Sequence, residues 1–347
     1  MDFGGGGDIR FERRGAAGII TLTRPKALNA LSLPMVQAMA RALEAWKADS
    51  GVAAIVVRGE GRAFCAGGDI ARVYEARQKG EPAVQFFAEE YRLNTMIESY
   101  PKPYVALIDG IVMGGGVGIS CHGSHRVMTE KALFAMPEVG IGFFPDVGGS
   151  HVLPGLPGRY GYYLALTGAR IKYGDALGAG LATHAMPADA LEGIVAEVAA
   201  NGYPDAALKA FTAAPPRETG EATLAKIAAH FSGPTLSSIL ASLEASAGAD
   251  EFAASTLATM RQRSPTSLAV AFRQISFGAG LSMRDCMRME FRILNRMLEG
   301  HDFYEGIRAV LIEKDNKPVW RPKTVEEVRS EDIAHYFETL GEAELTF

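Results

Sequence analysis

Two carboxylates in an almost wholly apolar run are the residues of this sequence best suited to chemistry. Glu138 and Asp146 lie within ALFAMPEVGIGFFPDVGGS, residues 132–150, and each directly follows a proline that restricts the backbone before it. Carboxylates are rarely buried in apolar surroundings unless another group pairs with them or a reaction uses them. A carboxyl group in such surroundings has a raised pKa and can exchange protons near neutral pH.

Each carboxylate also has a structural interpretation. PDVGGS could begin a helix, with Asp146 near its N-terminus as a capping residue, and this alternative competes seriously with a functional role. For Glu138, which lies inside FAMPEVGIGFF, the apolar surroundings favour function over capping.

Two glycine-rich turns precede these acids in the chain. CAGGD at 65–69 and MGGGVG at 113–118 each follow an apolar segment that is typical of a strand. Glycine lets the backbone approach a ligand closely, and a strand that ends at a helix N-terminus leaves free N–H groups. One N–H group from each turn could therefore hold one developing oxyanion. Either turn alone is best explained by tight packing, but the two turns together with the two acids favour a catalytic site.

The sequence lacks the motifs typical of phosphate binding, serine hydrolysis, zinc catalysis and dinucleotide binding. The sequence has no GxxxxGK[ST] phosphate loop, no GxSxG nucleophile elbow and no HExxH zinc motif, so we expect no metal. GGGVG at 114–118 does not fit the dinucleotide pattern GxGxxG, because Ile119 occupies the last glycine position. The three cysteines form no CxxC pair, which predicts free thiols in a reducing compartment.

Composition limits the range of partners. The 347 residues carry a net charge of −5, from 35 basic and 40 acidic residues, so the chain has no global attraction to nucleic acid or to an anionic membrane. No apolar run reaches the ~18 residues of a membrane span, and the first residues lack the apolar core of a secretory signal. We therefore expect a cytoplasmic protein with neither nucleic acid nor membrane as a partner.

The pattern along the chain predicts an α/β fold. IRFERRGAAGIITLTRP, residues 9–25, predicts a β-hairpin, and the run 33–49 has helical spacing with Ser32 as its N-cap. Apolar runs at 52–59 and 103–110 predict buried strands that alternate with helices, which indicates parallel pairing. From about residue 187 the pattern is helical. We therefore predict an α/β core over 1–186 that carries the site, and a mainly helical region over 187–347.

These motifs resemble those of a known family. RAFCAGGDI, GIVMGGGVGIS and AMPEVGIGFFPDVGGS are similar to motifs of the crotonase (enoyl-CoA hydratase/isomerase) superfamily. With GYYLALTGARI and GHDFYEGIRAVLIEKDNKPVWRP, the sequence resembles its 3-hydroxyisobutyryl-CoA hydrolase branch from about residue 10 to about residue 330. The resemblance implies the crotonase (ClpP-like) fold, a spiral of ββα units followed by a helical C-terminal region that completes an acyl-CoA pocket. It implies no separate cofactor, because CoA is part of the substrate, and it leaves open whether copies of the chain form a homo-oligomer.

The resemblance also implies roles for the residues of the two turns. By motif position, the backbone N–H groups of Gly68 and Gly115 donate to the thioester oxygen. The backbone of Ala66 and Gly68 lines the path of the CoA moiety. Glu90, in FFAEEYRL, falls on a further substrate-contact position, and its structural alternative is a solvated helix face.

For the two acids, the resemblance implies direct work on the substrate. Glu138 is the acid nearest the thioester, as nucleophile or as base for a water molecule. Asp146 lies at the substrate hydroxyl or at the attacking water. Enoyl-CoA hydratases carry a catalytic glutamate two residues beyond the third glycine of GGG, where this chain has Gly118. That difference argues against hydration and favours hydrolysis of a thioester.

The activity that the resemblance implies is hydrolysis of 3-hydroxyisobutyryl-CoA, and of 3-hydroxypropionyl-CoA, to CoA and the free hydroxy acid, as in valine catabolism. The first alternative is a hydratase or isomerase that acts on another short-chain acyl-CoA. The second is a protein of this fold that has lost catalysis and only binds acyl-CoA, against which the retention of both acids and both turns argues.

Overall fold

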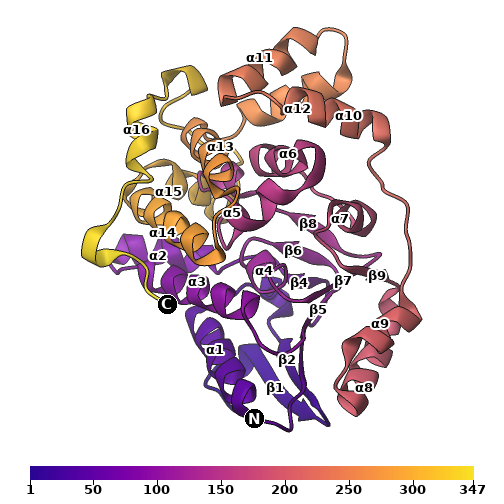
Figure 1. Ribbon diagram of the computed structural model, residues 1–347. Coiled ribbons are helices and arrows are strands. Elements are labelled where there is room, and N and C mark those ends of the chain that lie inside the picture. The colour runs from indigo at the N-terminus through magenta and orange to yellow at the C-terminus, as the bar shows by residue number, and fades with distance from the viewer. The chain divides into compact units, whose positions relative to one another are not determined.

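The computed structural model describes residues 1–347, which form two compact units (Figure 1). The first unit consists of Met1–Asp69, Gln85–Ala135 and Arg170–Glu218, and the second consists of Ile70–Val84, Met136–Ala169 and Thr219–Phe347. These units differ from a division at residue 187, because the first extends to Glu218 and the second includes two earlier segments. The packing of two helices that follow residue 187 onto the sheet of the first unit explains part of this difference.

The first unit contains two β-sheets. The order in the six-stranded sheet is β1 (Ile9–Arg14), β2 (Ala17–Leu22), β3 (Ala54–Gly59), β5 (Tyr104–Ile108), β7 (His125–Thr129) and β9 (His184–Met186). The order in the three-stranded sheet is β4 (Ala63–Cys65), β6 (Ile111–Met113) and β8 (Leu133–Ala135). The β1–β2 hairpin is antiparallel, and the other pairs are parallel. The predicted hairpin and the predicted parallel pairing are both confirmed.

A ββα order repeats along the chain. A strand of the six-stranded sheet, a strand of the three-stranded sheet and a helix follow one another three times. The repeats are β3, β4 and α2 (Ile70–Lys79); β5, β6 and α4 (Gly115–Gly118); and β7, β8 and the 3-10 helix η3 (Glu138–Ile141). This order is the predicted series of ββα units. In each repeat, candidate site residues lie between the second strand and the helix or at the start of the helix: Ala66 and Gly68, Gly115, and Glu138.

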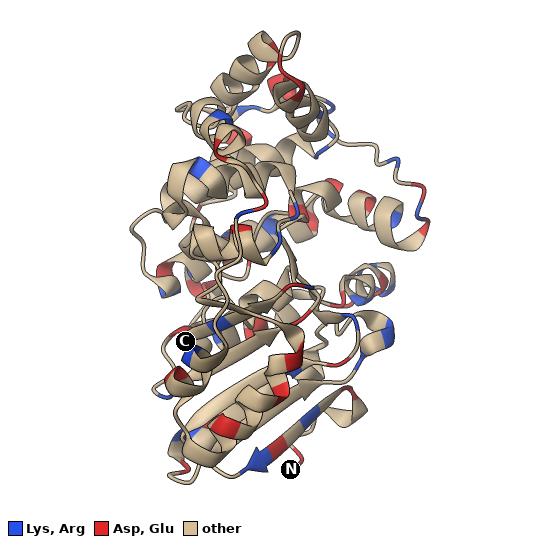
Figure 2. Ribbon diagram, turned by 90° about the vertical axis from the view of Figure 1, so that its right-hand side faces the viewer, with Lys and Arg blue, Asp and Glu red and all other residues tan.

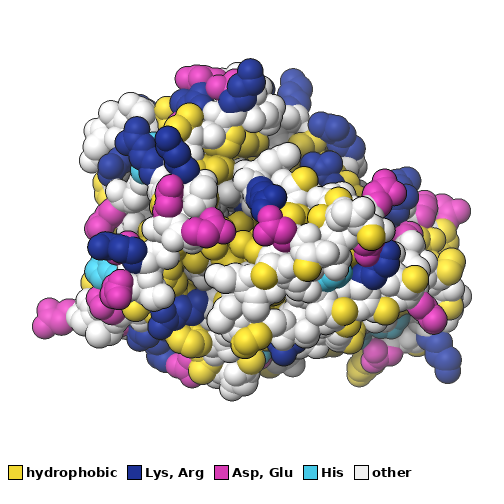
Figure 3. Space-filling model, turned by 90° about the horizontal axis from the view of Figure 1, so that it is seen from above, with side chains coloured by type: hydrophobic (Ala, Val, Ile, Leu, Met, Phe, Trp, Pro, Cys, Tyr) yellow, Lys and Arg dark blue, Asp and Glu magenta, His cyan; other side chains and the backbone are white.

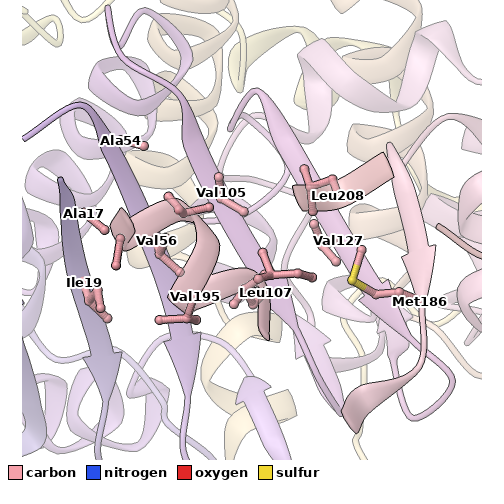
Figure 4. Packing of buried hydrophobic residues seen from close by; sticks show 13 residues of the cluster. Ala17, Ile19, Ala54, Val56, Val105, Leu107, Val127, Met186, Val195 and Leu208 are labelled. Atoms are coloured by element: carbon pink, nitrogen blue, oxygen red, sulfur yellow. The ribbon is translucent and has the colours of Figure 1, made fainter. Parts of the chain in front are cut away.

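One hydrophobic cluster of the first unit lies on one face of the larger sheet (Figure 4). Val56, Val105 and Leu107 point from the strands towards Val195 of α8 (Leu191–Asn201) and Leu208 of α9 (Pro204–Phe211). Central parallel strands are covered on both faces, so they take continuous apolar sequences. The other helices assigned mainly to this unit are α1 (Leu33–Ala48), α3 (Val84–Glu98) and α7 (Tyr173–Ala179).

Helix α1 begins where the sequence predicts, directly after Ser32. Ser32 is the N-cap residue, with a proline in the first turn, although its side chain makes no capping hydrogen bond. Met35, Met39 and Trp46 are among the residues that α1 buries. The apolar stripe therefore matters more than the cap for this helix.

The second unit is helical. Its helices besides α2 are α5 (Gly149–Val152), α6 (Tyr160–Thr167), α10 (Glu221–His230), α11 (Leu236–Ser246), α12 (Glu251–Arg261), α13 (Pro265–Gly278), α14 (Met283–Glu299), α15 (Asp302–Ile307) and α16 (Ser330–His335). Helix α13 packs against α5, α6 and α14. The side chains of Ser264 and Ser282 cap α13 and α14 by accepting from backbone N–H groups. The predicted helical character of the C-terminal part is confirmed.

Charge is distributed over both units. Basic and acidic residues are interspersed along the ribbon in Figure 2, and the face in Figure 3 carries both signs among apolar side chains. None of the helices combines the length and the apolar character that crossing a lipid bilayer would require.

Candidate active site

The two glycine-rich turns of the first unit lie next to each other. A Cβ atom placed on Gly115 would lie 3.2 Å from the backbone nitrogen of Gly68 and 2.4 Å from Oε1 of Glu90. The structure therefore brings together Gly68, Gly115 and Glu90, which the sequence predicts as site residues. A side chain at position 115 has no room unless Glu90 moves.

The turn that carries Gly68 is held by a short parallel bridge. The N–H of Leu31 donates to the carbonyl of Gly67 at 2.9 Å, and the N–H of Asp69 donates to the carbonyl of Leu31 at 2.8 Å. Gly67 has φ +124°, which side-chain-bearing residues rarely adopt. None of these backbone bonds uses the N–H of Gly68, which stays available as a donor.

Ala66 is positioned one residue before this left-handed glycine. Its N–H donates to the carbonyl of Leu28 at 3.0 Å, and the residue is half-buried. The backbone of the CAGGD turn is thus fixed on both sides of Gly67 by the segment that precedes α1.

The second turn ends at the short helix α4. Gly114, which precedes the helix, has φ +48° and ψ −123°, a conformation that requires glycine. Gly115 is the first residue of α4, so its N–H has no acceptor within the helix. Gly118, the position at which hydratases carry a glutamate, is buried at the end of this helix.

Glu90 lies on α3 and is only 2% exposed. A solvated helix face is therefore the wrong interpretation of this residue, because α3 buries this face against the glycine-rich turn. Asn94 follows one turn later and is fully buried, and neither atom of its amide group has a hydrogen-bond partner in the protein. Asn94 was not predicted as a site residue, although its spacing of four residues from Glu90 places it on the same helix face.

Glu138 lies in the second unit, at the start of η3. Its side chain is 5% exposed, and neither carboxylate oxygen has a hydrogen-bond partner. Burial, and next the nearby charge of Asp146, raise the pKa of Glu138 well above the ordinary value of 4.5. A buried carboxylate that the protein leaves unpaired is costly for stability, which favours a functional role for this residue.

Asp146 lies in the turn before α5 and is also 5% exposed. The N-cap of α5 is Gly148, and no side chain caps this helix, so the structural interpretation of Asp146 as a capping residue is wrong. Its charge acts on Glu138, so the two predicted acids are close enough to influence each other. Of the predicted site residues, Ala66, Gly68, Glu90 and Gly115 thus lie in the first unit, and Glu138 and Asp146 lie in the second.

Glu290 on α14 is a further buried acid, which was not predicted as a site residue. Its carboxylate accepts hydrogen bonds from the backbone N–H groups of Gly148 and Ser150, both at 2.9 Å. Burial raises the pKa of Glu290 to about 7, although these N–H donors oppose the rise. The sequence pattern could have indicated that Glu290 is buried. Glu290 lies within the apolar stripe of α14, which consists of Met283, Met287, Leu294 and Met297 at helical spacing.

The raised pKa of Glu138 predicts a pH-dependent stability. The folded state holds the proton of this carboxyl more tightly than the unfolded state, so stability falls as pH rises from the ordinary value through the folded value. Glu138→Gln removes this titration. We expect its melting temperature to exceed that of the wild type at pH 8 by more than at pH 5. Thermal unfolding at both pH values checks this, and an equal difference at both would contradict it.

Comparison with known proteins identifies the class of this protein. A sequence model of the enoyl-CoA hydratase/isomerase family matches residues 17–337. The chain belongs to this family, as its motifs indicate.

The individual relatives cover almost the whole chain. A mitochondrial 3-hydroxyisobutyryl-CoA hydrolase of Rattus norvegicus is 45% identical over 352 residues, which are 98% of this chain and 91% of the relative. The Homo sapiens protein of the same name is 42% identical with the same coverage. A crystal structure of a carnitinyl-CoA dehydratase from Mycobacterium thermoresistibile has a TM-score of 0.92 and 42% identity, covering 98% of both chains. One of an enoyl-CoA hydratase from Rhodobacter sphaeroides has a TM-score of 0.89 and 40% identity, covering 98% of this chain and all of the other. The predicted crotonase fold is thereby confirmed.

Proposed function

We propose that this protein hydrolyses the thioester of 3-hydroxyisobutyryl-CoA to CoA and 3-hydroxyisobutyrate. The observation that carries the proposal is the identity of 42% to 45%, over 98% of the chain, to relatives named 3-hydroxyisobutyryl-CoA hydrolase. The buried Glu138, whose carboxylate has no partner in the protein, supplies a group for this chemistry. We extend the proposal to 3-hydroxypropionyl-CoA, which retains the 3-hydroxyacyl group without the methyl branch.

In the proposed reaction, the N–H groups of Gly68 and Gly115 form an oxyanion hole for the negative charge that develops on the thioester oxygen. Glu138 either attacks the carbonyl carbon or removes a proton from the water that attacks. Attack by Glu138 forms a mixed anhydride as the C–S bond breaks, and the thiolate of CoA leaves and takes up a proton. Water then hydrolyses the anhydride. On the second route, water adds directly and the same C–S bond breaks.

The other predicted residues recognise the substrate in this proposal. Asp146 accepts a hydrogen bond from the substrate hydroxyl or orients the attacking water, and Glu90 contacts the acyl group beside Gly115. The backbone of Ala66 and Gly68 lines the CoA path. The chemistry requires no metal and no cofactor besides the CoA of the substrate.

A substrate panel tests the proposal. We expect rapid CoA release, detected with a thiol reagent, from 3-hydroxyisobutyryl-CoA and 3-hydroxypropionyl-CoA, and little from crotonyl-CoA. Loss of the enoyl absorbance of crotonyl-CoA without any thiol release would contradict hydrolysis and show a hydratase instead. Tight binding of the esters with neither change would show a binding protein.

Hydration is the second candidate function. It is favoured by the solved structures at 40% and 42% identity, which are described as a hydratase and a dehydratase. Gly118 argues against it, because this position supplies no second carboxylate. The same panel separates the two functions, since only hydrolysis releases a thiol.

The location of the protein, its metabolic pathway, its partners and its oligomeric state stay predictions. A cytoplasmic location rests on the sequence, whereas the curated relatives are mitochondrial by name. A place in valine catabolism depends on the acyl preference that the panel measures. Acyl-CoA is the expected small-molecule partner, and we predict no nucleic-acid or membrane partner. Whether copies of the chain form a homo-oligomer is decided by measuring the mass in solution.

A further inference from the structure

We propose that Glu290 is a positioning residue, which holds the turn of Asp146 through the backbone N–H groups of Gly148 and Ser150. Oε2 of Glu290 accepts from Gly148 and Oε1 accepts from Ser150, each at 2.9 Å. The two donors flank Gly149, the first residue of α5, so both carboxylate oxygens are committed to the start of this helix.

The backbone of this turn needs such a restraint. Val147, which directly follows Asp146, has φ +50°, a region that β-branched residues rarely adopt. Gly148 follows with φ +89°. Strained residues of this kind persist only where the surrounding structure holds them. The bonds from Gly148 and Ser150 to Glu290 begin one residue after Val147, so Glu290 is well placed to maintain this geometry.

A second side chain holds the same turn from another helix. The amide of Gln274, on α13, donates to the carbonyl of Pro145 and to Oγ of Ser150. Glu290 and Gln274 are both fully buried. The turn is thus held at Pro145, Gly148 and Ser150 by two helices, and Asp146 lies between the first two of these points.

Glu290 differs from Glu138 in the hydrogen bonds that its carboxylate oxygens accept. Both of its oxygens accept backbone hydrogen bonds, whereas those of Glu138 have no hydrogen-bond partner. Bonds from N–H groups to a carboxylate are strongest when the carboxylate is ionised, which Glu290 is above its pKa of about 7. Glu290 therefore acts on the reaction through the position of Asp146 rather than through contact with the substrate. The expected effect of Glu290 on kcat rests on the proposed function. Its expected effect on the backbone turn at residues 145–150 does not.

Glu290→Gln is the first test. Glutamine keeps the shape but replaces one acceptor oxygen with an NH₂ group, which cannot accept from a backbone N–H. We expect faster hydrogen exchange in peptides that cover residues 145–152. We also expect kcat for 3-hydroxyisobutyryl-CoA to fall roughly 10- to 100-fold, the effect of one charge-assisted bond, with KM changed less than kcat. Glu290→Asp, which keeps both acceptors on a shorter side chain, should recover part of the loss.

Glu299→Gln is the matched control, because Glu299 lies exposed on the same helix. This variant should change neither the hydrogen exchange of residues 145–152 nor kcat. If Glu290→Gln does not fold, the comparison of Glu290→Asp with the wild type decides, since a displaced carboxylate must raise exchange in the same peptides.

Unchanged exchange over residues 145–152, or faster exchange with unchanged kcat, would overturn the inference. A uniform rise in exchange across α13 and α14, with kcat falling only in proportion to the unfolded fraction, would show a merely structural role and would also overturn it. If the wild type releases no CoA, the proposed function fails, and the exchange experiment still decides whether Glu290 holds the turn.

Discussion

Glu138→Gln is expected to lower kcat for thioester hydrolysis by about 10²- to 10⁴-fold, the usual contribution of a positioned acid or base, with little change in KM. Glutamine has nearly the same shape as glutamate, so the site keeps its form. It can neither attack the thioester carbon nor remove a proton from water. Steady-state kinetics with 3-hydroxyisobutyryl-CoA, read as CoA release, measures the effect.

Two controls make this result specific. Glu342→Gln changes an exposed glutamate of the same unit and should leave kcat unchanged. A single turnover in ¹⁸O-water distinguishes the two routes, because only the anhydride route places label in the carboxylate of Glu138. Near wild-type activity of Glu138→Gln would exclude both routes.

Gly115→Ala is expected to reduce kcat by about 10²- to 10³-fold, the usual effect of losing one oxyanion donor. The new methyl group would lie 2.4 Å from Oε1 of Glu90 and 3.2 Å from the nitrogen of Gly68, so the two turns must separate or Glu90 must move. Steady-state kinetics, together with a melting temperature to confirm folding, measures the result.

The matched control is Gly220→Ala, because a Cβ atom at Gly220 meets nothing within 4 Å. Combining Gly115→Ala with Glu90→Asp separates the two causes. Recovery of activity in the double variant would assign the loss to displacement of Glu90. Continued loss would assign it to the N–H donors, and full activity of Gly115→Ala itself would contradict the oxyanion assignment.

Much of the fold could be predicted because its signals are local. The hairpin of β1 and β2, the buried strands and the start of α1 follow from alternation, apolar runs and a serine before a proline. The boundary between the units could not be predicted in this way. Helices α8 and α9 look like the helices after them, and only their packing on the larger sheet assigns them to the first unit.

Part of the candidate site could also be predicted from local sequence, and part could not. The glycine-rich turns and the two acids in the apolar run are visible in the sequence, because both depend on residue type and on immediate neighbours. Glu90 was visible only through a family resemblance, since its approach to Gly115 depends on how α3 packs.

By itself the sequence determined which elements form, which positions need glycine and that Glu138 and Asp146 enter apolar surroundings. Only the tertiary structure decided which of these groups meet. Glu290 and Gly148 are 142 residues apart in the chain, and nothing in the local sequence of either residue specifies the other. The physical reason is that helix and strand formation depends on neighbouring residues, whereas contacts between distant segments depend on the packing of whole faces. The bond between Glu290 and Gly148 therefore exists only once α14 is packed beside α5.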